Sequence, residues 1–443
     1  MGLNVKIARL TLDIMVKVLR ILLSFSIMML LAACSGSASG EVSDDIVEFA
    51  GAGTCVPALK HDEFVILAWY ELIDINADNL LDEYKDPSAE WRLRMLSEAG
   101  FNTYYDYRLD CLEEAEALLG LGDKVGMNII LDSPELHDPS QTEKVIETMA
   151  VHPSLFAYSV WDEPEVSEFP EVIGRIKEIY KYDKEHPCYV NLLPNYAWDE
   201  WVEDRYLETV RHYLKSVPVS FLSFDYYPVV FLDEDGEMPQ PPGPGQRMLR
   251  EAWYHNLEDI RTAALEAEVP IWAFALAKPH GVYPMPTLAD LRLQQFSNLV
   301  YGAVAFQYFT ARAIVWKESL TSIYPLVKQV NHELKQMEKI FLGAEIKGIW
   351  HTGDQIPRGT KKPDILPDGI SSLETRGEGA VVSHFTNNGK NYIAFVNRSC
   401  VSEITLSIRF DGEASCVHKD GSQSSVSASY VIEPGDIRIF TWK

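Results

Sequence analysis

Residues 102–131 read NTYYDYRLDCLEEAEALLGLGDKVGMNIIL and contain one full repeat of the pattern that decides the fold. Strand-like runs at residues 102–105 and 127–131 flank a segment with helical periodicity, whose acidic stretch at residues 111–116 is typical of an exposed helix face. A strand, a helix and a second strand in this order predict two parallel strands joined by a crossover helix.

The same alternation runs through most of the chain. Helix boundaries are marked by Pro87 after Asp86, by the terminal Gly100, and by Thr287 with Asp290 in a variant of the capping box. The last long helix is expected at residues 319–339. The strand-like apolar runs lie at residues 64–68, 102–105, 127–131, 156–160, 189–193, 220–224, 271–275 and 303–308.

Eight such repeats predict an α/β fold in which residues 59–341 form a closed (β/α)8 barrel, or TIM barrel. An open doubly wound sheet is the alternative. It is disfavoured because no glycine-rich turn follows the first strand. Residues 342–443 have a different sequence pattern, because strand-like runs at 379–385, 391–396 and 437–442 alternate with turns rich in Gly, Asn, Asp and Ser. They predict a small all-β sandwich domain with a stabilising role.

The composition places the chain among globular proteins. It has 443 residues, of which 47% are hydrophobic and 23% charged. With 39 basic and 65 acidic residues, the formal net charge is −26. Nucleic acid is therefore not an expected partner, because its recognition needs clustered Lys and Arg.

Residues 1–33 have the pattern of an export signal. Four basic residues precede an apolar run at residues 21–33, which is shorter than the roughly 20 residues that a membrane-spanning helix needs. The run ends in Leu31-Ala32-Ala33-Cys34, which resembles the lipobox of bacterial lipoproteins. This resemblance implies a lipid anchor at Cys34 that holds the protein at a membrane, followed by a tether at residues 34–58. Ser35 after the cysteine favours the outer membrane.

An exported location permits disulfides, and Cys400 and Cys416 lie in neighbouring strand-like segments that can form one. The sequence has no C-x-x-C spacing and no histidine cluster, so no metal site is expected. No cofactor is expected either.

The end of the fourth strand carries the strongest catalytic signal. Trp161-Asp162-Glu163-Pro164 places two acids at a position where (β/α)8 enzymes carry reactive groups. Two adjacent carboxylates at such an end predict a raised pKa for Glu163, as a general acid needs.

Other strand ends combine acids with aromatic residues, a combination that suits sugars because rings pack on C–H faces while carboxylates accept hydroxyl protons. Asp225 follows the sixth strand and is the expected base beside Glu163. The expected carbohydrate-binding residues are Tyr105, Asp106, Trp161, Asp162, Asn195, Tyr227, Trp272, His280 and Tyr308.

These motifs, together with Asp225-Tyr226-Tyr227-Pro228 and Tyr301-Gly302-Ala303, resemble clan-A glycoside hydrolases of the β-galactosidase-like kind. The resemblance implies that Glu163 is the acid/base, with Asp162 in place of the usual Asn. In that clan the nucleophilic Glu ends the seventh strand. Here the stretch 270–277 contains no carboxylate, and the next one along the chain is Asp290.

Three interpretations follow for a site without that nucleophile. In the first, preferred one, Asp225 activates water for an inverting reaction, which needs carboxyl groups about 6.5–9.5 Å apart. In the second, Asp106 or Asp132 does so. In the third, the barrel binds a glycan without cleaving it. A lyase that uses Lys278, His280 or a tyrosine as its base is a further alternative.

Overall fold

The computed structural model describes residues 56–57, 62–74, 77, 79–197, 204–232 and 246–443. The expected signal at residues 1–33, the expected lipidation site Cys34 and most of the expected tether at residues 34–58 lie outside these ranges. Within them, no helix is both long and apolar enough to cross a membrane.

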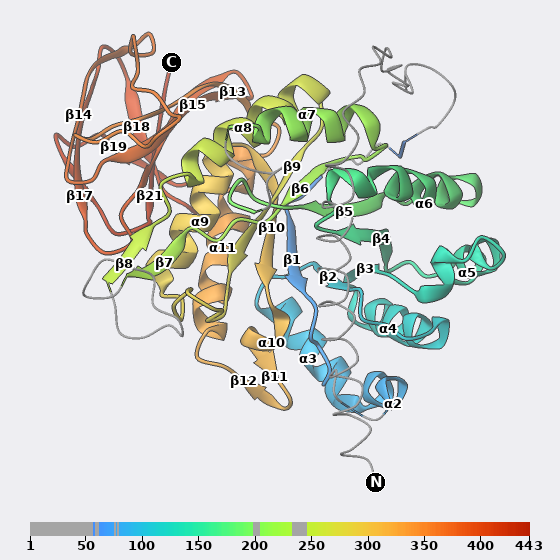
Figure 1. The fold of residues 1–443 in the computed structure, drawn as a ribbon. Helices are drawn as coiled ribbons and strands as arrows, with labels where there is room; N and C mark the ends of the chain where they lie inside the picture. Colours follow the sequence, from blue (N-terminus) through green and yellow to red (C-terminus); the bar gives the residue numbers. More distant parts are fainter. Residues whose placement is uncertain (1–55, 58–61, 75–76, 78, 198–203, 233–245) are drawn as a thin grey trace, which may run out of the picture. The chain divides into compact units, whose positions relative to one another are not determined.

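Eight parallel strands close into a barrel, confirming the predicted fold class (Figure 1). Around the barrel the strands follow the order β1-β10-β9-β6-β5-β4-β3-β2. Each predicted run overlaps one of them. The strands are β1 (Val65–Trp69), β2 (Thr103–Asp106), β3 (Asn128–Leu131), β4 (Leu155–Asp162), β5 (Cys188–Leu192), β6 (Leu222–Phe224), β9 (Ile271–Leu276) and β10 (Ala303–Phe309).

Helices alternate with the strands and begin at the predicted caps. Asp86 accepts a hydrogen bond from the Ser88 amide with Pro87 in the first helical position, and Thr287 with Asp290 forms a reciprocal capping box. The helices are α2 (Leu80–Lys85), α3 (Pro87–Glu98), α4 (Leu112–Val125), α5 (Thr142–Met149), α6 (Phe169–Tyr182), α7 (Tyr206–Ser216), α8 (Trp253–Ala267), α9 (Leu288–Val300), α10 (Ala311–Ile314) and α11 (Tyr324–Phe341), with 3-10 turns η2 (Pro134–His137) and η3 (Val166–Glu168).

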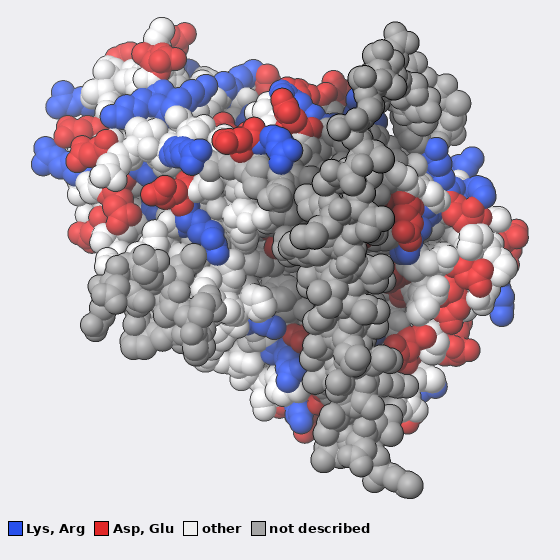
Figure 2. All heavy atoms as spheres, viewed as in Figure 1, with Lys and Arg blue, Asp and Glu red and all other residues white. Residues whose placement is uncertain are grey.

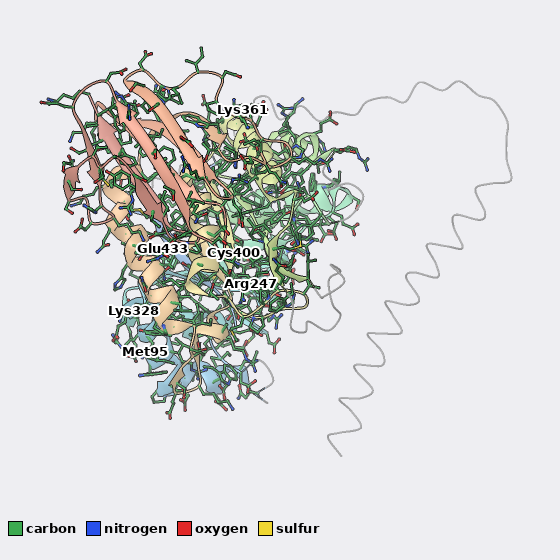
Figure 3. The ribbon with its side chains drawn as sticks, turned by 90° about the vertical axis from the view of Figure 1, so that its left-hand side faces the viewer. Met95, Arg247, Lys328, Lys361, Cys400 and Glu433 are labelled. Atoms are coloured by element: carbon green, nitrogen blue, oxygen red, sulfur yellow. The ribbon has the colours of Figure 1, made fainter. Side chains whose placement is uncertain are left out.

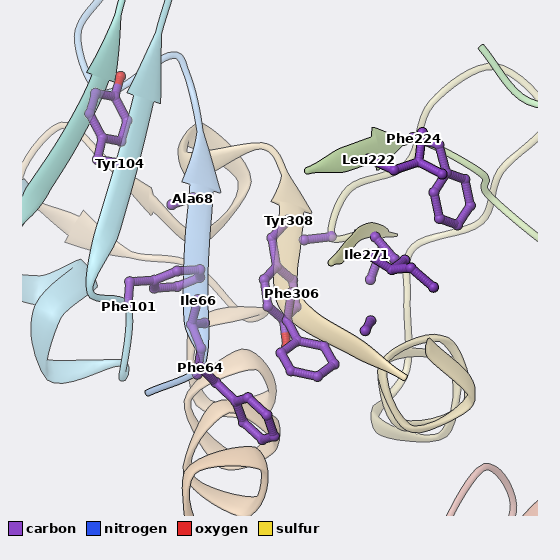
Figure 4. Packing of buried hydrophobic residues seen from close by; sticks show 14 of the residues in the cluster. Phe64, Ile66, Ala68, Phe101, Tyr104, Leu222, Phe224, Ile271, Phe306 and Tyr308 are labelled. Atoms are coloured by element: carbon purple, nitrogen blue, oxygen red, sulfur yellow. The ribbon is translucent and has the colours of Figure 1, made fainter. Parts of the chain in front are cut away.

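Strand side chains are divided between two cores. Val65, Leu67 and Trp69 of β1 belong to the cluster inside the barrel, whereas Phe64 and Ile66 belong to the larger cluster beneath the helices (Figure 4). Period-two alternation produces this division. Both faces of these strands are therefore largely buried, which explains why most of their residues are apolar.

Two small hairpins extend the barrel. One joins β7 (Val229–Leu232) to β8 (Gln246–Leu249) between β6 and α8, and the other joins β11 (Val315–Trp316) to β12 (Ser319–Leu320). The second occupies the beginning of the predicted last helix. That helix, α11, therefore starts at Tyr324 rather than near residue 319.

The C-terminal region is all β, as predicted. A six-stranded antiparallel sheet in the order β13-β15-β16-β21-β18-β19 accompanies a three-stranded sheet in the order β14-β17-β20 (Figure 3). The strands are β13 (Glu345–His351), β14 (Ile370–Arg376), β15 (Ala380–Asn387), β16 (Lys390–Asn397), β17 (Ile404–Phe410), β18 (Ala414–Val417), β19 (Gln423–Ser425), β20 (Tyr430–Ile432) and β21 (Ile437–Trp442).

Partly buried ion pairs join this region to the barrel helices. Arg292 of α9 pairs with Glu333 of α11 and lies 3.6 Å from Asp436, while Lys419 lies 2.6 Å from Asp436 and 3.0 Å from Glu333. The four side chains therefore connect two helices to the loops of the β region.

Two further sequence-based expectations concern thiols and surface charge. Cys400 and Cys416 are both free thiols, so the suggested disulfide between them is not formed.

On the face shown in Figure 2, basic and acidic side chains of the described residues are intermixed.

Candidate active site

Glu163 follows β4 directly and lies at the carboxyl end of the barrel. Its backbone φ is 53°, a left-handed conformation that is uncommon outside glycine, and its amide donates to the Asn191 carbonyl at 2.9 Å. This hydrogen bond continues the ladder to β5 for one residue beyond the last strand position. The local turn thus fixes where the Glu163 side chain leaves the strand, and the residue is exposed there.

The carboxyl groups of Glu163 and Asp225 are hydrogen-bonded to each other. Desolvation raises the pKa of Glu163, and the hydrogen bond with Asp225 opposes that rise. Asp225, after β6, is only 7% exposed, and burial followed by the charges of Glu163 and Asp162 raises its pKa well above the ordinary range. Because two ionised carboxylates in contact repel each other, the pair favours a state in which one of the two keeps its proton.

Asp162 is the third carboxyl of this group. Burial, reinforced by the charge of Glu163, raises the pKa of Asp162 to about 7. The Asn191 amide nitrogen lies 3.4 Å from Asp162 Oδ1 and 3.3 Å from Asp225 Oδ1, so it bridges the two. The three acids therefore form one cluster around the end of β5.

A polar network inside the barrel supports this cluster. The Ser223 hydroxyl donates to Asn191 Oδ1 at 2.9 Å and accepts from Gln307 Nε2 at 2.9 Å. Gln307 Oε1 accepts from the Tyr189 hydroxyl at 2.6 Å, and that hydroxyl accepts from the Trp69 indole at 3.3 Å. Because these side chains are buried and paired, the network restricts the orientation of the Asn191 amide.

Aromatic side chains surround the same end of the barrel. Tyr227 is 9% exposed, and its ring lies 5.7 Å from that of Tyr283. The exposed His280 stacks on Tyr283 with centroids 6.1 Å apart, and burial together with the charge of Lys278 lowers its pKa. Tyr105 lies deeper, stacked on Trp69 at 4.4 Å. The structure thus places Tyr227 and His280 at the rim and Tyr105 in the barrel interior.

Several expected sugar-binding residues are engaged elsewhere. Asp106 is buried outside the barrel and accepts from the hydroxyls of Tyr84 at 3.0 Å and Tyr104 at 2.6 Å. Asn195 is 2% exposed, and its backbone N–H donates to Asn256 Oδ1 at 3.0 Å. Neither residue is brought to the acid cluster, because each links a strand end to a neighbouring helix.

Three expected aromatic contacts are corrected by their packing. Trp272 is fully buried inside the barrel and stacked on Phe221 at 4.0 Å, and Tyr308 is fully buried in the outer core (Figure 4). Trp161 packs against the outer core and lies under the Arg175 guanidinium at 4.5 Å. These three side chains are therefore part of the packing and are not placed as aromatic surfaces for a sugar.

Asp132, the alternative second acid, lies after β3. Its Oδ1 is 2.7 Å from His137 Nε2 in the following 3-10 turn. Burial raises the pKa of Asp132, and the contact with His137 opposes that rise. The structure therefore pairs Asp132 with its own loop rather than with Glu163.

The sequence reasoning missed two charged residues at the mouth. Glu71, two residues after β1, accepts from the Thr310 hydroxyl at 3.0 Å and lies 3.5 Å from Lys278 Nζ. Arg108 lies over the Tyr70 ring at 4.3 Å and lowers the pKa of Asp162. Both residues follow barrel strands closely, and this position was the signal by which the sequence could have identified them.

Among the described residues, no group of three or more His, Cys, Asp and Glu side chains is suited to hold a metal ion.

Comparison with known proteins gives structural similarity only. No family profile and no curated protein matches the chain. Three of the most similar solved structures are a Gas2 complex with compound 10 (16% identity, TM-score 0.40, covering 62% of this chain and 69% of that chain), a beta-glucuronidase from an uncultured Clostridium sp. (12%, 0.40, 61% and 50%) and a glycoside hydrolase family 5 mannosidase from Rhizomucor miehei (11%, 0.40, 66% and 98%). At these scores the similarities do not establish an activity.

Proposed function

We propose that the protein is a glycoside hydrolase in which Glu163 donates a proton to the oxygen of the glycosidic bond. The observation that carries this proposal is the hydrogen-bonded pair of Glu163 and Asp225 at the carboxyl end of the barrel. An acid catalyst must hold its proton at the working pH, and the raised pKa of Glu163 acts in that direction.

In this arrangement Asp225 shares a proton with Glu163, and its hydrogen bond lowers the pKa of Glu163 against the rise that burial causes. A base that activates water in an inverting reaction lies about 6.5–9.5 Å from the acid, and a hydrogen-bonded carboxyl pair leaves no such gap. The role of water-activating base, which the sequence suggested for Asp225, is therefore less suited to this geometry than a role in positioning and proton sharing.

A carbohydrate suits the rest of the rim. Tyr227 and Tyr283 offer aromatic edges, and Asp162 offers a carboxyl group that can hydrogen-bond sugar hydroxyls. The barrel mouth thus joins an acid to polar and aromatic contacts, the combination on which sugar recognition depends.

The decisive experiment measures hydrolysis of aryl glycosides and oligosaccharides by the parent, Glu163→Gln and a control, Glu147→Gln. Glu147 is exposed on α5, away from the barrel mouth. We expect Glu163→Gln to lower kcat/KM for poor leaving groups by roughly a hundredfold to ten-thousandfold. It should affect 2,4-dinitrophenyl glycosides much less, because that leaving group needs no proton. The control should match the parent.

A second candidate function is glycan binding without cleavage. It is favoured by the end of β9, where Ala277 and Lys278 stand in place of a carboxylate. A parent protein that binds oligosaccharides in calorimetry but hydrolyses none of a broad panel would establish this function and exclude the enzyme.

We also propose that the protein is a lipoprotein of the outer membrane, anchored through Cys34. The supporting feature is the Leu-Ala-Ala-Cys sequence at residues 31–34. Radiolabelled palmitate should label the parent but not Cys34→Ser, and only the parent should fractionate with outer membranes. Equal labelling of both would exclude the anchor.

A further inference from the structure

Glu71 resembles Glu163 in how the backbone presents it. Its φ is 65°, beside 53° for Glu163, and each follows a barrel strand within two residues. Among the described residues, the other non-glycine positions with positive φ are Glu268, Lys317 and Asn388, which do not follow barrel strands. Such conformations cost free energy and cluster where function requires a particular side-chain direction.

Side chains from two other strands hold the Glu71 carboxylate. Thr310, after β10, donates to Oε2 at 3.0 Å, and Lys278, after β9, lies 3.5 Å from the same oxygen. Glu71 is 8% exposed, so its negative charge needs these partners. The end of the seventh strand thus contributes a cation that stabilises a carboxylate from the first strand.

Glu71 and the acid cluster belong to the same mouth. Burial raises the pKa of Tyr70, and the charges of both Glu71 and Asp162 contribute to that rise, so the tyrosine lies within electrostatic reach of both. In the closed sheet β2 and β3 separate β1 from β4. At about 4.8 Å per neighbouring strand, this separation keeps the ends of β1 and β4 apart, whereas the carboxyl groups of Glu163 and Asp225 are in direct contact.

We propose that Glu71 is the second catalytic carboxylate, the base of an inverting hydrolysis. This inference rests on the proposed glycosidase function. Glu163 gives its proton to the leaving oxygen as the glycosidic C–O bond breaks. Glu71 takes a proton from the water whose oxygen forms the new bond to the anomeric carbon. The products are the free sugar and the alcohol, and the proton on Glu71 returns to Glu163 through solvent.

The surroundings of the two glutamates suit opposite roles. Glu163 lies against another carboxyl group, that of Asp225, whereas Glu71 Oε2 lies 3.5 Å from the Lys278 ammonium. Titratable groups in contrasting environments are the usual basis for dividing acid and base roles. Lys278 and Thr310 act here as positioning residues, since they contact the carboxylate rather than the reacting atoms.

The test compares Glu71→Gln with Glu268→Gln, which changes an exposed glutamate whose φ is also positive, at 56°, but which caps α8. We expect Glu71→Gln to lower kcat/KM on the order of a thousandfold, even with 2,4-dinitrophenyl glycosides. The control should stay within twofold. Matching circular dichroism and thermal melts would show that the glutamine variant folds.

Chemical rescue adds a readout that a structural role would not change. In Glu71→Ala, azide or formate should restore part of the rate, and proton NMR of the parent reaction should show inverted anomeric configuration in the first product. Retention, absence of rescue, or activity of Glu71→Gln within tenfold of the parent would overturn the proposal. If Glu163→Gln is then still inactive on poor leaving groups, the glycosidase function stands without Glu71. A parent that hydrolyses nothing overturns both.

Discussion

The Asn191 side chain donates to Asp225 Oδ1 at 3.3 Å from inside the barrel and lowers the pKa of that buried acid. The same nitrogen lies 3.4 Å from Asp162 Oδ1 and lowers its pKa as well. The neutral Asn191 amide therefore lowers the pKa values of two of the three acids in the cluster. Because Ser223 and Gln307 fix the amide from below, its effect depends on the barrel interior.

Replacing Asn191 by Ala should therefore raise the pKa values of Asp162 and Asp225, since their ionised forms lose a hydrogen bond. The alkaline limb of the kcat/KM profile should move to higher pH by about one unit, because the acid cluster keeps its proton longer. The profile is measured with a substrate that has a poor leaving group. An unchanged limb, with thermal stability retained, would contradict the assigned role of Asn191.

The raised pKa of Asp162 also predicts how stability depends on pH. The folded protein holds this proton up to about pH 7, whereas an unfolded aspartate loses it near pH 4, so the folded state binds more protons between those values. The contribution of Asp162 to stability therefore falls as pH rises from about 4 to about 7.

Asp162→Asn removes that dependence. We expect its Tm to exceed that of the parent by several degrees at pH 8 and to differ little at pH 4, as measured by calorimetry. A variant that loses stability equally at both pH values would show instead that Asp162 is stabilising in its ionised form.

A different residue tests the barrel interior. Trp272 has no exposed surface and stacks on Phe221 at 4.0 Å with an interplanar angle of 12°. Trp272→Ala should lower the free energy of unfolding by about 3–5 kcal/mol, as removal of a large buried side chain does. Denaturant unfolding measures the change. A loss below about 1 kcal/mol would mean that the ring is not part of the core.

The sequence was sufficient to predict the strands but not the faces of their side chains. Both faces of a parallel strand are apolar, so 271–275 and 303–308 lack the alternation that separates barrel interior from helix side. The sequence pattern therefore does not distinguish buried positions for Trp272 and Tyr308 from positions at the rim. Trp161 shows a second reason, because the register of β4 against β5 shifts between Ser159 and Trp161. Such an irregularity changes which way the following side chain points.

The candidate site was predictable where its residues are adjacent in sequence. Asp162 and Glu163 stand together, and Asp225 follows an obvious strand. Glu71 acquires its significance from Thr310, 239 residues away, and from Lys278. No local sequence pattern predicts the contacts of Glu71 with these two residues, because the contacts form only when the barrel closes. The hydrogen bond between Glu163 and Asp225 depends on closure in the same way.

The ion pairs between the β region and the helices support the end of the barrel that carries Lys278. Gln294 and Asn298 of α9 hydrogen-bond to backbone groups of β9, and Arg292 of the same helix pairs with Glu333. Glu333 is mostly buried and also contacts Lys419.

Glu333→Gln should therefore lower the free energy of unfolding by about 1.5–3 kcal/mol, since two cations lose a charged partner. Glu413→Gln is the matched control, because its pair with Lys443 is almost fully exposed and its loss should not be measurable. Urea unfolding at low and high salt distinguishes the two, since partly buried pairs are screened less. Equal effects of both substitutions would mean that the four-residue cluster adds nothing to the attachment of the β region.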